Sequence, residues 1–216
     1  MGATVRLGLD FDNTIVCYDR LFHAVALEQG LVPASLPPSK LAVRDHLRRT
    51  GRERRWTELQ GYVYGARMDE ALPAPGVVGC IAALRELRVS ISIVSHKTAR
   101  PVVGPPYDLH GAARRWIRRR LVDREGRPLI DEARIHFAPT RREKLARIAA
   151  LGCTHFVDDL PEVVADASFP ATCCAILYDP EGRHDLPRRG RRCRSWAEIA
   201  AFLTAAARDA EATDGR

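Results

Sequence analysis

The chain has 216 residues, 46% of them hydrophobic, which is enough to bury a core and excludes extensive disorder. Its formal charge of +7 is carried almost entirely by arginine, because Lys40, Lys97 and Lys144 are its only lysines. No apolar run approaches the roughly 20 residues that cross a bilayer, and the first residues lack the pattern of a signal peptide. We therefore expect no membrane partner, and a cytoplasmic protein whose six cysteines stay reduced.

The first half of the chain is expected to contain one strand followed by a block of helices. Residues 5–9 (VRLGL) form a short apolar run before two aspartates, which is typical of a buried parallel strand. Residues 21–72 have the pattern of helices, one of them with Ser39 as its N-cap. The PAPG sequence at residues 73–76 ends this block, and an amphipathic helix is expected at residues 77–88.

Strands and helices alternate in the rest of the chain. Strands are expected at residues 89–94, 135–137, 154–157 and 173–178, and helices begin after the N-cap residues Asp108, Thr140 and Ser195. This alternation is typical of an open parallel sheet with helices on both faces. We predict the α/β class: a Rossmann-like core (residues 1–16 and 76–208), a small helical cap (17–75) and a disordered tail (209–216).

Polar residues follow three of the predicted strands. Asp10 and Asp12 come after the first strand, Ser95 after the second, and Asp158 and Asp159 after a later one. Because ligands bind beyond the carboxyl ends of parallel strands, we expect these side chains to meet at one edge of the sheet. Each residue alone could be an ordinary turn former or cap. Four carboxylates in one place need a cation, and Mg²⁺ prefers such oxygen ligands.

These residues resemble the signatures of the haloacid dehalogenase superfamily. LDFDNTI (residues 9–15) is similar to its first signature, Asp-x-Asp-x-Thr, and Ser95 to its second. Lys144 is similar to the third, and FVDDLPE (residues 156–162) to the acidic fourth. The order and spacing hold over residues 5–165, and the helical block lies where this family places a cap.

The resemblance implies a role for four of these residues. Asp10 would be the nucleophile that forms an aspartyl-phosphate. Asp12 would protonate the leaving group and then activate water. Ser95 would hydrogen-bond a phosphoryl oxygen, and Lys144 would neutralise the charge that builds up on the phosphoryl group.

Three neighbouring residues are expected to support substrate binding. Thr14 would brace the loop of the first signature through its side chain. Lys97, just after the second signature, is a rival to Lys144 as the phosphate ligand. His96 is expected to be a loop residue beside the substrate and not a catalyst.

The metal ligands implied by the resemblance are all aspartates. Asp10, the backbone carbonyl of Asp12, and Asp159 would hold Mg²⁺, with Asp158 beside them. We favour Asp159 over Asp158 as the direct ligand of this pair, but the sequence leaves the choice open.

The predicted function is a Mg²⁺-dependent phosphomonoester hydrolase acting on a small phosphorylated metabolite. Asp12 favours phosphoryl transfer over dehalogenation, because a departing halide needs no proton. A phosphonate hydrolase would need a Schiff-base lysine in the cap, and the only one there, Lys40, lies in a helix rich in surface residues.

Three alternatives stay open at this point: a phosphomutase, a polynucleotide end phosphatase, and an inactive module that binds a phosphorylated ligand. Residues 97–142 contain twelve lysines and arginines against five acidic residues, a charge that would suit nucleic acid. Few aromatic side chains accompany that charge, so we expect a solvated surface there and favour the small substrate.

Overall fold

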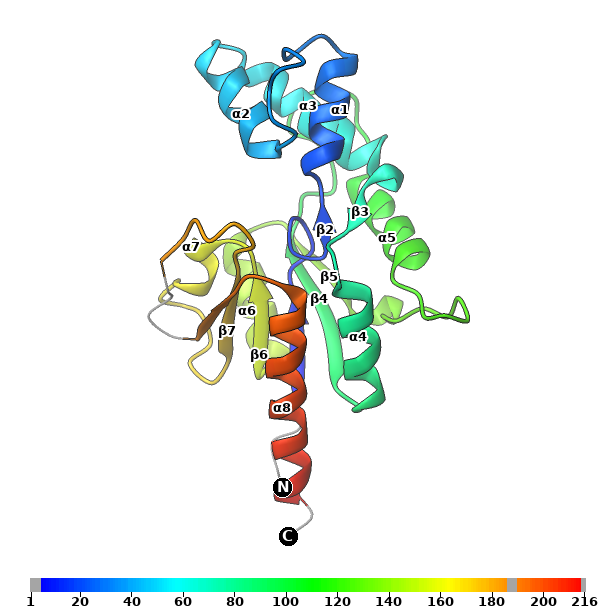
Figure 1. Ribbon diagram of the computed structural model, residues 1–216, viewed down its shortest axis with the longest axis vertical. Coiled ribbons are helices and arrows are strands. Elements are labelled where there is room, and N and C mark those ends of the chain that lie inside the picture. The colour runs from blue at the N-terminus through cyan, green and yellow to red at the C-terminus, as the bar shows by residue number, and fades with distance from the viewer. Residues whose placement is uncertain (1–4, 186–189, 215–216) are drawn as a thin grey trace.

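The computed structural model describes residues 5–185 and 190–214. Its centre is a six-stranded parallel sheet with the order β5-β4-β1-β6-β7-β8 (Figure 1). The strands are β1 (Arg6–Leu9), β4 (Ser90–His96), β5 (Ile135–Ala138), β6 (His155–Asp158), β7 (Cys174–Tyr178) and β8 (Arg191–Cys193). The predicted α/β class is confirmed. Because β1 lies between β4 and β6, the polar residues that follow these three strands are neighbours.

Buried apolar side chains and one glycine hold the middle of the sheet together. Leu7 and Leu9 of β1 are almost fully buried. A Cβ atom on Gly8 would lie 2.4 Å from the ring of Phe156, so only glycine lets β1 approach this β6 side chain so closely. The edge strand β8 was not predicted, because it is short and begins with Arg191 and Arg192, which mask the strand pattern.

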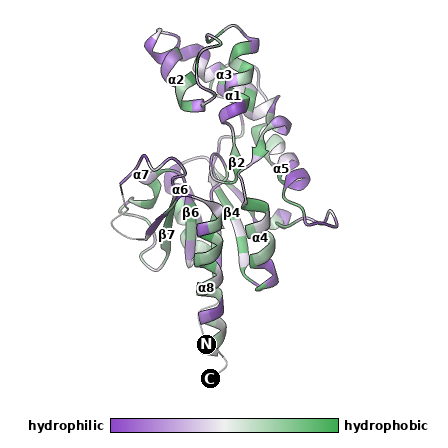
Figure 2. Ribbon diagram, in the orientation of Figure 1, coloured by the Kyte–Doolittle hydropathy of each residue, from purple (hydrophilic) through white to green (hydrophobic). Residues whose placement is uncertain are grey.

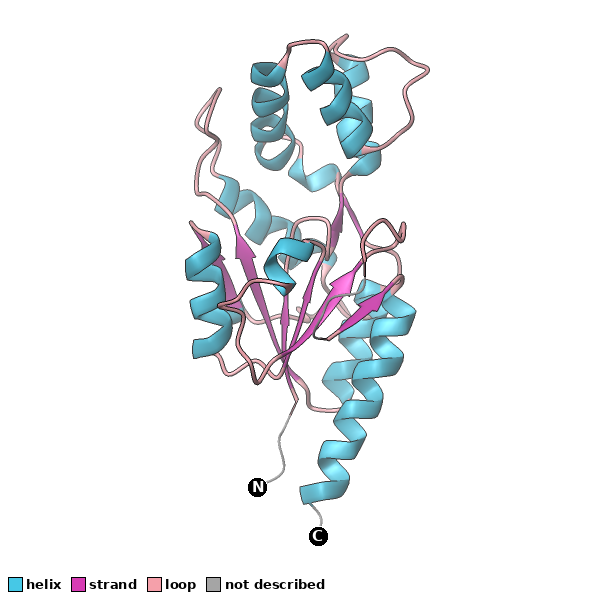
Figure 3. Cartoon of the chain, turned by 90° about the vertical axis from the view of Figure 1, so that its left-hand side faces the viewer, coloured by secondary structure: helices cyan, strands magenta, loops and turns pink. Residues whose placement is uncertain are grey.

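Helices cover both faces of the sheet (Figure 3). The core helices are α4 (Val77–Glu86), α5 (Leu109–Arg120), α6 (Arg141–Ala150), α7 (Pro161–Val164) and α8 (Trp196–Asp214). On one face, Val94 and Phe156 of the sheet share a buried cluster with Leu145 of α6. On the other, Leu9 belongs to the same cluster as Trp196 of α8. Figure 2 shows the strands as mainly hydrophobic, as expected for a sheet covered on both sides.

The predicted helix starts are confirmed by side-chain hydrogen bonds. The oxygens of Ser39, Asp108, Thr140 and Ser195 accept from backbone N–H groups three residues further on. The carboxylate of Glu198 completes the start of α8 by accepting from the N–H of Arg194. The helix α8 includes residues 209–214 of the stretch 209–216 that we had assigned to a disordered tail, whose last two residues lie outside the described range. Ala210 packs against the core, and Ala210 and Ala212 favour continued helix.

A helical lobe stands above the carboxyl edge of the sheet (Figure 1). It consists of α1 (Asp19–Glu28), α2 (Lys40–Arg49), α3 (Glu53–Gly65) and a short 3₁₀ helix, η1 (Met68–Glu70). The lobe joins the core through two antiparallel strands, β2 (Val16–Cys17) and β3 (Leu72–Pro73). Its own core includes Phe22 of α1 and Trp56 of α3, whose rings lie 5.1 Å apart.

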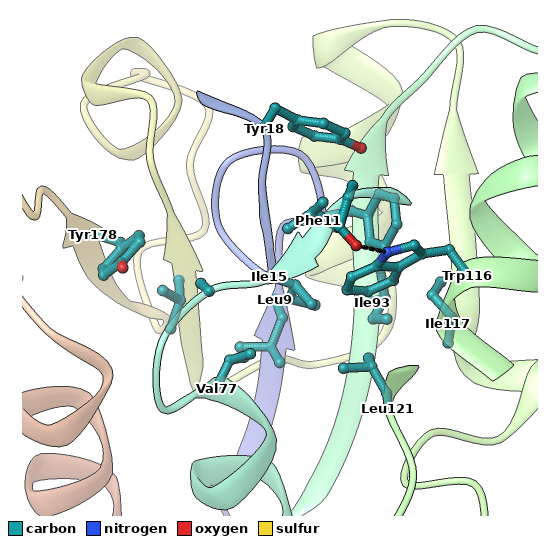
Figure 4. Packing of buried hydrophobic residues seen from close by; sticks show 14 of the residues in the cluster. Leu9, Phe11, Ile15, Tyr18, Val77, Ile93, Trp116, Ile117, Leu121 and Tyr178 are labelled. Carbon is teal, nitrogen blue, oxygen red and sulfur yellow. Dashed lines mark hydrogen bonds between the residues drawn. The ribbon is translucent and has the colours of Figure 1, made fainter. Parts of the chain in front are cut away.

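Trp116 of α5 connects the core to the base of this lobe (Figure 4). Its ring packs edge-on against Phe11, with the centroids 5.5 Å apart, and its Nε1 donates to the carbonyl of Ala71 at 2.8 Å. Phe11 lies between Asp10 and Asp12, so this packing also fixes the loop that carries both aspartates.

Two expectations about the whole chain can be compared with the structure. Among residues 5–185 and 190–214, no helix is both long enough and apolar enough to span a bilayer. All six cysteines are free thiols, in agreement with the prediction that they form no disulfide framework.

Candidate active site

The residues selected from the sequence converge at the carboxyl ends of β1, β4 and β6. A cavity of about 560 Å³ lies there, and its walls include Asp10, Asp12, Ser95, His96, Lys144 and Asp159. Loop geometry helps to place the first signature: Asn13 has a left-handed φ of 61°, and the carbonyl of Phe11 accepts from the N–H groups of Ile15 and Val16. The loop therefore turns tightly just after the two aspartates.

Lys144 forms the most buried charged contact of the site. Its Nζ lies 2.5 Å from Oδ1 of Asp10 and 2.5 Å from Oδ2 of Asp158. Burial lowers the pKa of Lys144, but these two carboxylates raise it by more, so the pKa lies above its usual value. The ammonium group therefore stays charged and holds Asp10 in place. In this structure it is Lys144, the residue of α6, that contacts the expected nucleophile.

Asp10, Asp158 and Asp159 form a group that suits a divalent metal ion. They offer carboxylate oxygens that all lie within 4.8 Å of one another. Burial raises the pKa of Asp159 well above its usual range, and the charges of Asp10 and Asp158 raise it further. A hard divalent cation relieves this repulsion, and a set of carboxylate oxygens is what Mg²⁺ prefers. The residues present therefore fit the predicted metal.

The two neighbouring aspartates of the fourth signature have different surroundings. Asp158 is fully buried, and its second oxygen accepts from the N–H of Leu160 at 3.0 Å. Asp159 lines the cavity and accepts from the hydroxyl of Thr14 at 3.3 Å. Thr14 thus braces the site as expected, although it does so by holding Asp159. The choice of Asp159 as the direct metal ligand stays a prediction, which its position in the cavity wall favours.

The side chain of Asp12 lies outside this acidic group. Its oxygens accept from Nζ of Lys97 at 2.8 and 3.0 Å, and Oδ1 accepts from the hydroxyl of Tyr18 at 2.5 Å. Burial raises the pKa of Asp12, but Lys97 and Tyr18 lower it by more, so the pKa lies below its usual value. The structure therefore places Lys97 against Asp12, whereas we had considered it as a rival phosphate ligand.

The remaining two predicted residues differ in their freedom to bind a ligand. Ser95 is 1% exposed, lines the cavity and is the last buried residue of β4. His96 also lines the cavity, but its Nε2 lies 3.1 Å from the carbonyl of Pro139 and donates to it. His96 is the last residue of β4 and not a loop residue, so that expectation was wrong, but this contact does tie its imidazole to the backbone beside the cavity.

The sequence analysis did not select Tyr18, Lys40 or Tyr64 as site residues. Lys40 lines the cavity and its Nζ donates to Oδ1 of Asn13 at 3.0 Å. The same Nζ lies 5.6 to 5.7 Å from the ring centroids of Tyr18, Phe22 and Tyr64. The N-terminal turn of α2 faces the core, and no local pattern in the sequence reveals that orientation.

One sequence signal could have identified Lys40. The chain contains only three lysines among its 34 lysines and arginines, and all three lie at this site. Burial lowers the pKa of Lys40, but Tyr64, Asp12 and Asp159 raise it by more, so the pKa lies above its usual value.

Removing Lys144 should destabilise the protein as well as the site. Lys144→Met leaves Asp10 and Asp158 buried without their shared cation, and breaking such a pair costs about 3–5 kcal/mol. Urea unfolding in EDTA should show this loss, and excess Mg²⁺ should restore part of it. Arg54→Met is the control, because it removes one exposed ion pair worth less than about 1 kcal/mol. Equal unfolding free energies for the Lys144→Met variant and the parent protein would contradict the proposed electrostatics.

A scan against protein-family models finds no match, and a search of curated sequences finds no significant one. Solved structures do match. A HAD family hydrolase from Deinococcus radiodurans R1, with bound phosphate and sodium, has a TM-score of 0.56 and 16% identity, over 96% of this chain and 98% of that one. A predicted phosphoglycolate phosphatase from Haemophilus somnus 129pt has a TM-score of 0.54 and 15% identity, over 93% of this chain and 98% of that one. A dehalogenase has a TM-score of 0.53 and 12% identity, over 94% of this chain and 98% of that one.

The chain therefore has the fold of the haloacid dehalogenase-like hydrolases, over nearly its whole length. This confirms, at the level of the fold, the resemblance seen in its sequence motifs. At identities of 12–16% the similarity shows the fold alone. The reaction has to be argued from the residues of this chain.

Proposed function

We propose that the chain is a Mg²⁺-dependent phosphomonoester hydrolase that works through an aspartyl-phosphate on Asp10. The observation that supports this most is the contact of Lys144 with both Asp10 and Asp158, beside a cavity that Ser95 and Asp159 also line. With Asp10 as the nucleophile, a carboxylate, a fixed positive charge and a hydroxyl donor would surround one space. A phosphoryl group needs all three.

In the first step, an oxygen of Asp10 attacks phosphorus and the bond from phosphorus to the leaving oxygen breaks. The hydroxyl of Ser95 donates to a phosphoryl oxygen, and Lys144 offsets the negative charge in the transition state. Asp12 would take up a proton when the substrate binds, from the phosphate monoanion or from solvent, and would give that proton to the departing alkoxide. Mg²⁺, held by Asp10, Asp159 and the backbone carbonyl of Asp12, would neutralise phosphoryl charge and align the substrate.

In the second step, Asp12 takes a proton from water, and the water oxygen attacks the phosphorus of the aspartyl-phosphate. The acyl–phosphate bond breaks, phosphate leaves, and the Asp10 carboxylate is restored. The contacts from Lys97 and Tyr18 favour the charged form of Asp12, which is the form that acts as a base. These contacts support the second step more directly than the first.

Two features favour a phosphate ester of a small metabolite over the alternatives. Asp12 would supply a proton that a departing halide does not need, so we do not extend the dehalogenase activity of one structural neighbour to this chain. The basic stretch at residues 97–142 is extensively ion-paired, as in the contacts Arg114–Glu132, Arg119–Asp69, Arg127–Asp123 and Arg141–Asp166. Such pairing suits a solvated surface better than a groove for a polynucleotide. The helical lobe would then act as a cap that admits the metabolite, in a cytoplasmic setting.

Metal removal tests the proposed function directly. Hydrolysis of p-nitrophenyl phosphate should require Mg²⁺ and disappear in excess EDTA, because the three crowded carboxylates need the cation to bind a further anion. Ca²⁺ should bind but inhibit, since its longer bonds and higher coordination number favour bidentate capture of Asp10. The measurement is steady-state release of nitrophenolate with each metal after dialysis against EDTA. Full turnover in excess EDTA would overturn the proposal.

A further inference from the structure

A second cavity of about 420 Å³ lies between the helical lobe and the loop that follows β7. It shares Asn13, Lys40, Asp159 and Leu160 with the cavity of the candidate active site. The two spaces therefore meet, so a molecule with its phosphoryl group over Asp10 would extend past Lys40 into the second cavity. Its volume is that of a pocket for a small molecule.

The wall that the helical lobe contributes is a row of cations. Lys40, Arg44 and Arg48 all line this cavity. They are spaced by four residues in α2, so they lie on one face of the helix over successive turns. Leu41 and Trp56 of the lobe and Leu160 and Pro180 of the core add apolar surface that would contact a carbon skeleton.

Asp159 lines this cavity and is the proposed metal ligand, and the other carboxylates around it already have partners within the chain. Asp19 accepts from the N–H of Lys40 at 2.8 Å, and Asp179 accepts from two consecutive N–H groups at 3.0 Å. Glu53 forms a two-pronged contact with Arg48, at 2.8 and 3.0 Å. Glu181 pairs with Arg183.

The cationic groups of Lys40 and Arg44 have fewer contacts with carboxylates of the chain. The Lys40 ammonium donates to a neutral amide oxygen, that of Asn13, and lies against the aromatic rings of the lobe, so none of these contacts is with a carboxylate. Within the described ranges, Arg44 makes one side-chain hydrogen bond, from Nε to the adjacent Asp45, whose side chain is 58% exposed. The N–H groups on the terminal guanidinium nitrogens of Arg44 are therefore available as donors. Their planar arrangement matches the oxygens of a carboxylate or a phosphate.

We infer that the substrate carries a second anionic group, a carboxylate or a further phosphate, which Lys40 and Arg44 bind while the ester phosphate lies over Asp10. This inference rests on the proposed function and narrows its substrate class. The expected ligand is a small metabolite with two anionic ends, separated by a short carbon skeleton that packs against Leu160. A substrate with one anionic end leaves Arg44 without a ligand partner and should bind more weakly.

Three synthetic substrates with the same chain length test this. Propyl phosphate has one anionic end, 3-(phosphonooxy)propanoate adds a carboxylate, and propane-1,3-diol bisphosphate adds a phosphate. Charge-assisted hydrogen bonds should make kcat/KM for at least one of the two compounds with a second anionic group about 10- to 100-fold higher than for propyl phosphate, mainly through KM. Which of the two is preferred distinguishes a carboxylate from a phosphate as the second group.

Variants of α2 assign the effect to Arg44. The preference is the ratio of kcat/KM for the compound with a second anionic group to kcat/KM for propyl phosphate. Arg44→Gln should reduce this ratio at least tenfold, and Arg44→Glu should reverse the preference. Arg49→Gln is the matched control, because Arg49 belongs to the same helix but is exposed and outside the cavity; its preference should equal that of the parent. Because Arg44 is partly exposed at the cavity wall, its variants should keep the parent's melting temperature.

The outcomes separate this inference from the proposed function. If p-nitrophenyl phosphate is hydrolysed but all three compounds react equally well, the inference is overturned and the proposed function stands. A preference that survives in Arg44→Gln also overturns it. If no phosphate ester is hydrolysed with Mg²⁺, the proposed function fails and the inference fails with it.

Discussion

Asp10→Asn is expected to abolish hydrolysis of p-nitrophenyl phosphate, with kcat falling by about 10⁴-fold or more. Asparagine keeps the shape and can still accept from Lys144, but its neutral amide cannot attack phosphorus, so no aspartyl-phosphate forms. Loss of a residue that forms the covalent intermediate can cost about 10⁶-fold in other hydrolases. The measurement is steady-state release of nitrophenolate with Mg²⁺.

The control for this variant is an exposed aspartate. Asp131→Asn removes the same charge from a surface position and should leave kcat unchanged. Thermal unfolding should show that Asp10→Asn remains folded, since the contact with Lys144 can persist. If Asp10→Asn keeps a substantial fraction of the parent's turnover, Asp10 is not the nucleophile.

Asp12→Asn is expected to slow the enzyme in a way that depends on the leaving group. A general acid is typically worth about 10² to 10⁴-fold, so hydrolysis of an alkyl phosphate should fall by that factor. Nitrophenolate departs without a proton, so the first step with the aryl substrate should be nearly intact. Hydrolysis of the intermediate would still lack its base. We therefore expect a burst of about one nitrophenolate per enzyme, followed by slow turnover.

Rapid-quench kinetics can separate these steps, provided that the variant is folded. Lys97 is 4% exposed and loses its charged partner in Asp12→Asn, so the melting temperature should be measured in parallel. Absence of a burst in a folded variant with slow turnover would remove Asp12 from the second step.

The convergence of Asp10, Ser95 and Asp159 could be predicted from the sequence because it follows from topology. Each residue comes directly after an apolar strand, and parallel strands bring their carboxyl ends to one edge. Lys144 could be placed only through the family resemblance, since a lysine in a helix carries no such signal. Its contact with Asp10 and Asp158 is the detail that the structure adds.

The contributions of the helical lobe could not be predicted, because they depend on how the lobe is placed over the sheet. Tyr18 and Tyr64 look like ordinary core aromatics in the sequence. In the structure, the hydroxyl of Tyr18 donates to Asp12, and the ring centroid of Tyr64 lies 4.7 Å from Nζ of Lys97. Lys40 belongs to a helix that is otherwise rich in surface residues. Only the scarcity of lysine in the chain pointed to Lys40, and that signal is read with hindsight.

The edges of the fold were hard to predict for a different reason. The strand β8 is too short and too rich in arginine to show the alternation of a strand, and it adds to the sheet through backbone pairing with β7. The helix α8 extends to Asp214 because Ala210 and Ala212 favour helix and Ala210 packs against the core. Local propensity and tertiary pairing decide these segments, and hydrophobic periodicity does not report on either.

The central claim, a phosphoryl group carried by Asp10, can be measured as a covalent adduct. Asp12→Asn should accumulate the intermediate, so acid quenching during the slow phase with p-nitrophenyl phosphate and Mg²⁺ should trap it. Mass spectrometry of the digested protein is expected to find one added phosphoryl group on the peptide that contains Asp10, sensitive to hydroxylamine as an acyl phosphate is. An adduct on any other residue, or none while a burst of nitrophenolate is seen, would contradict the mechanism.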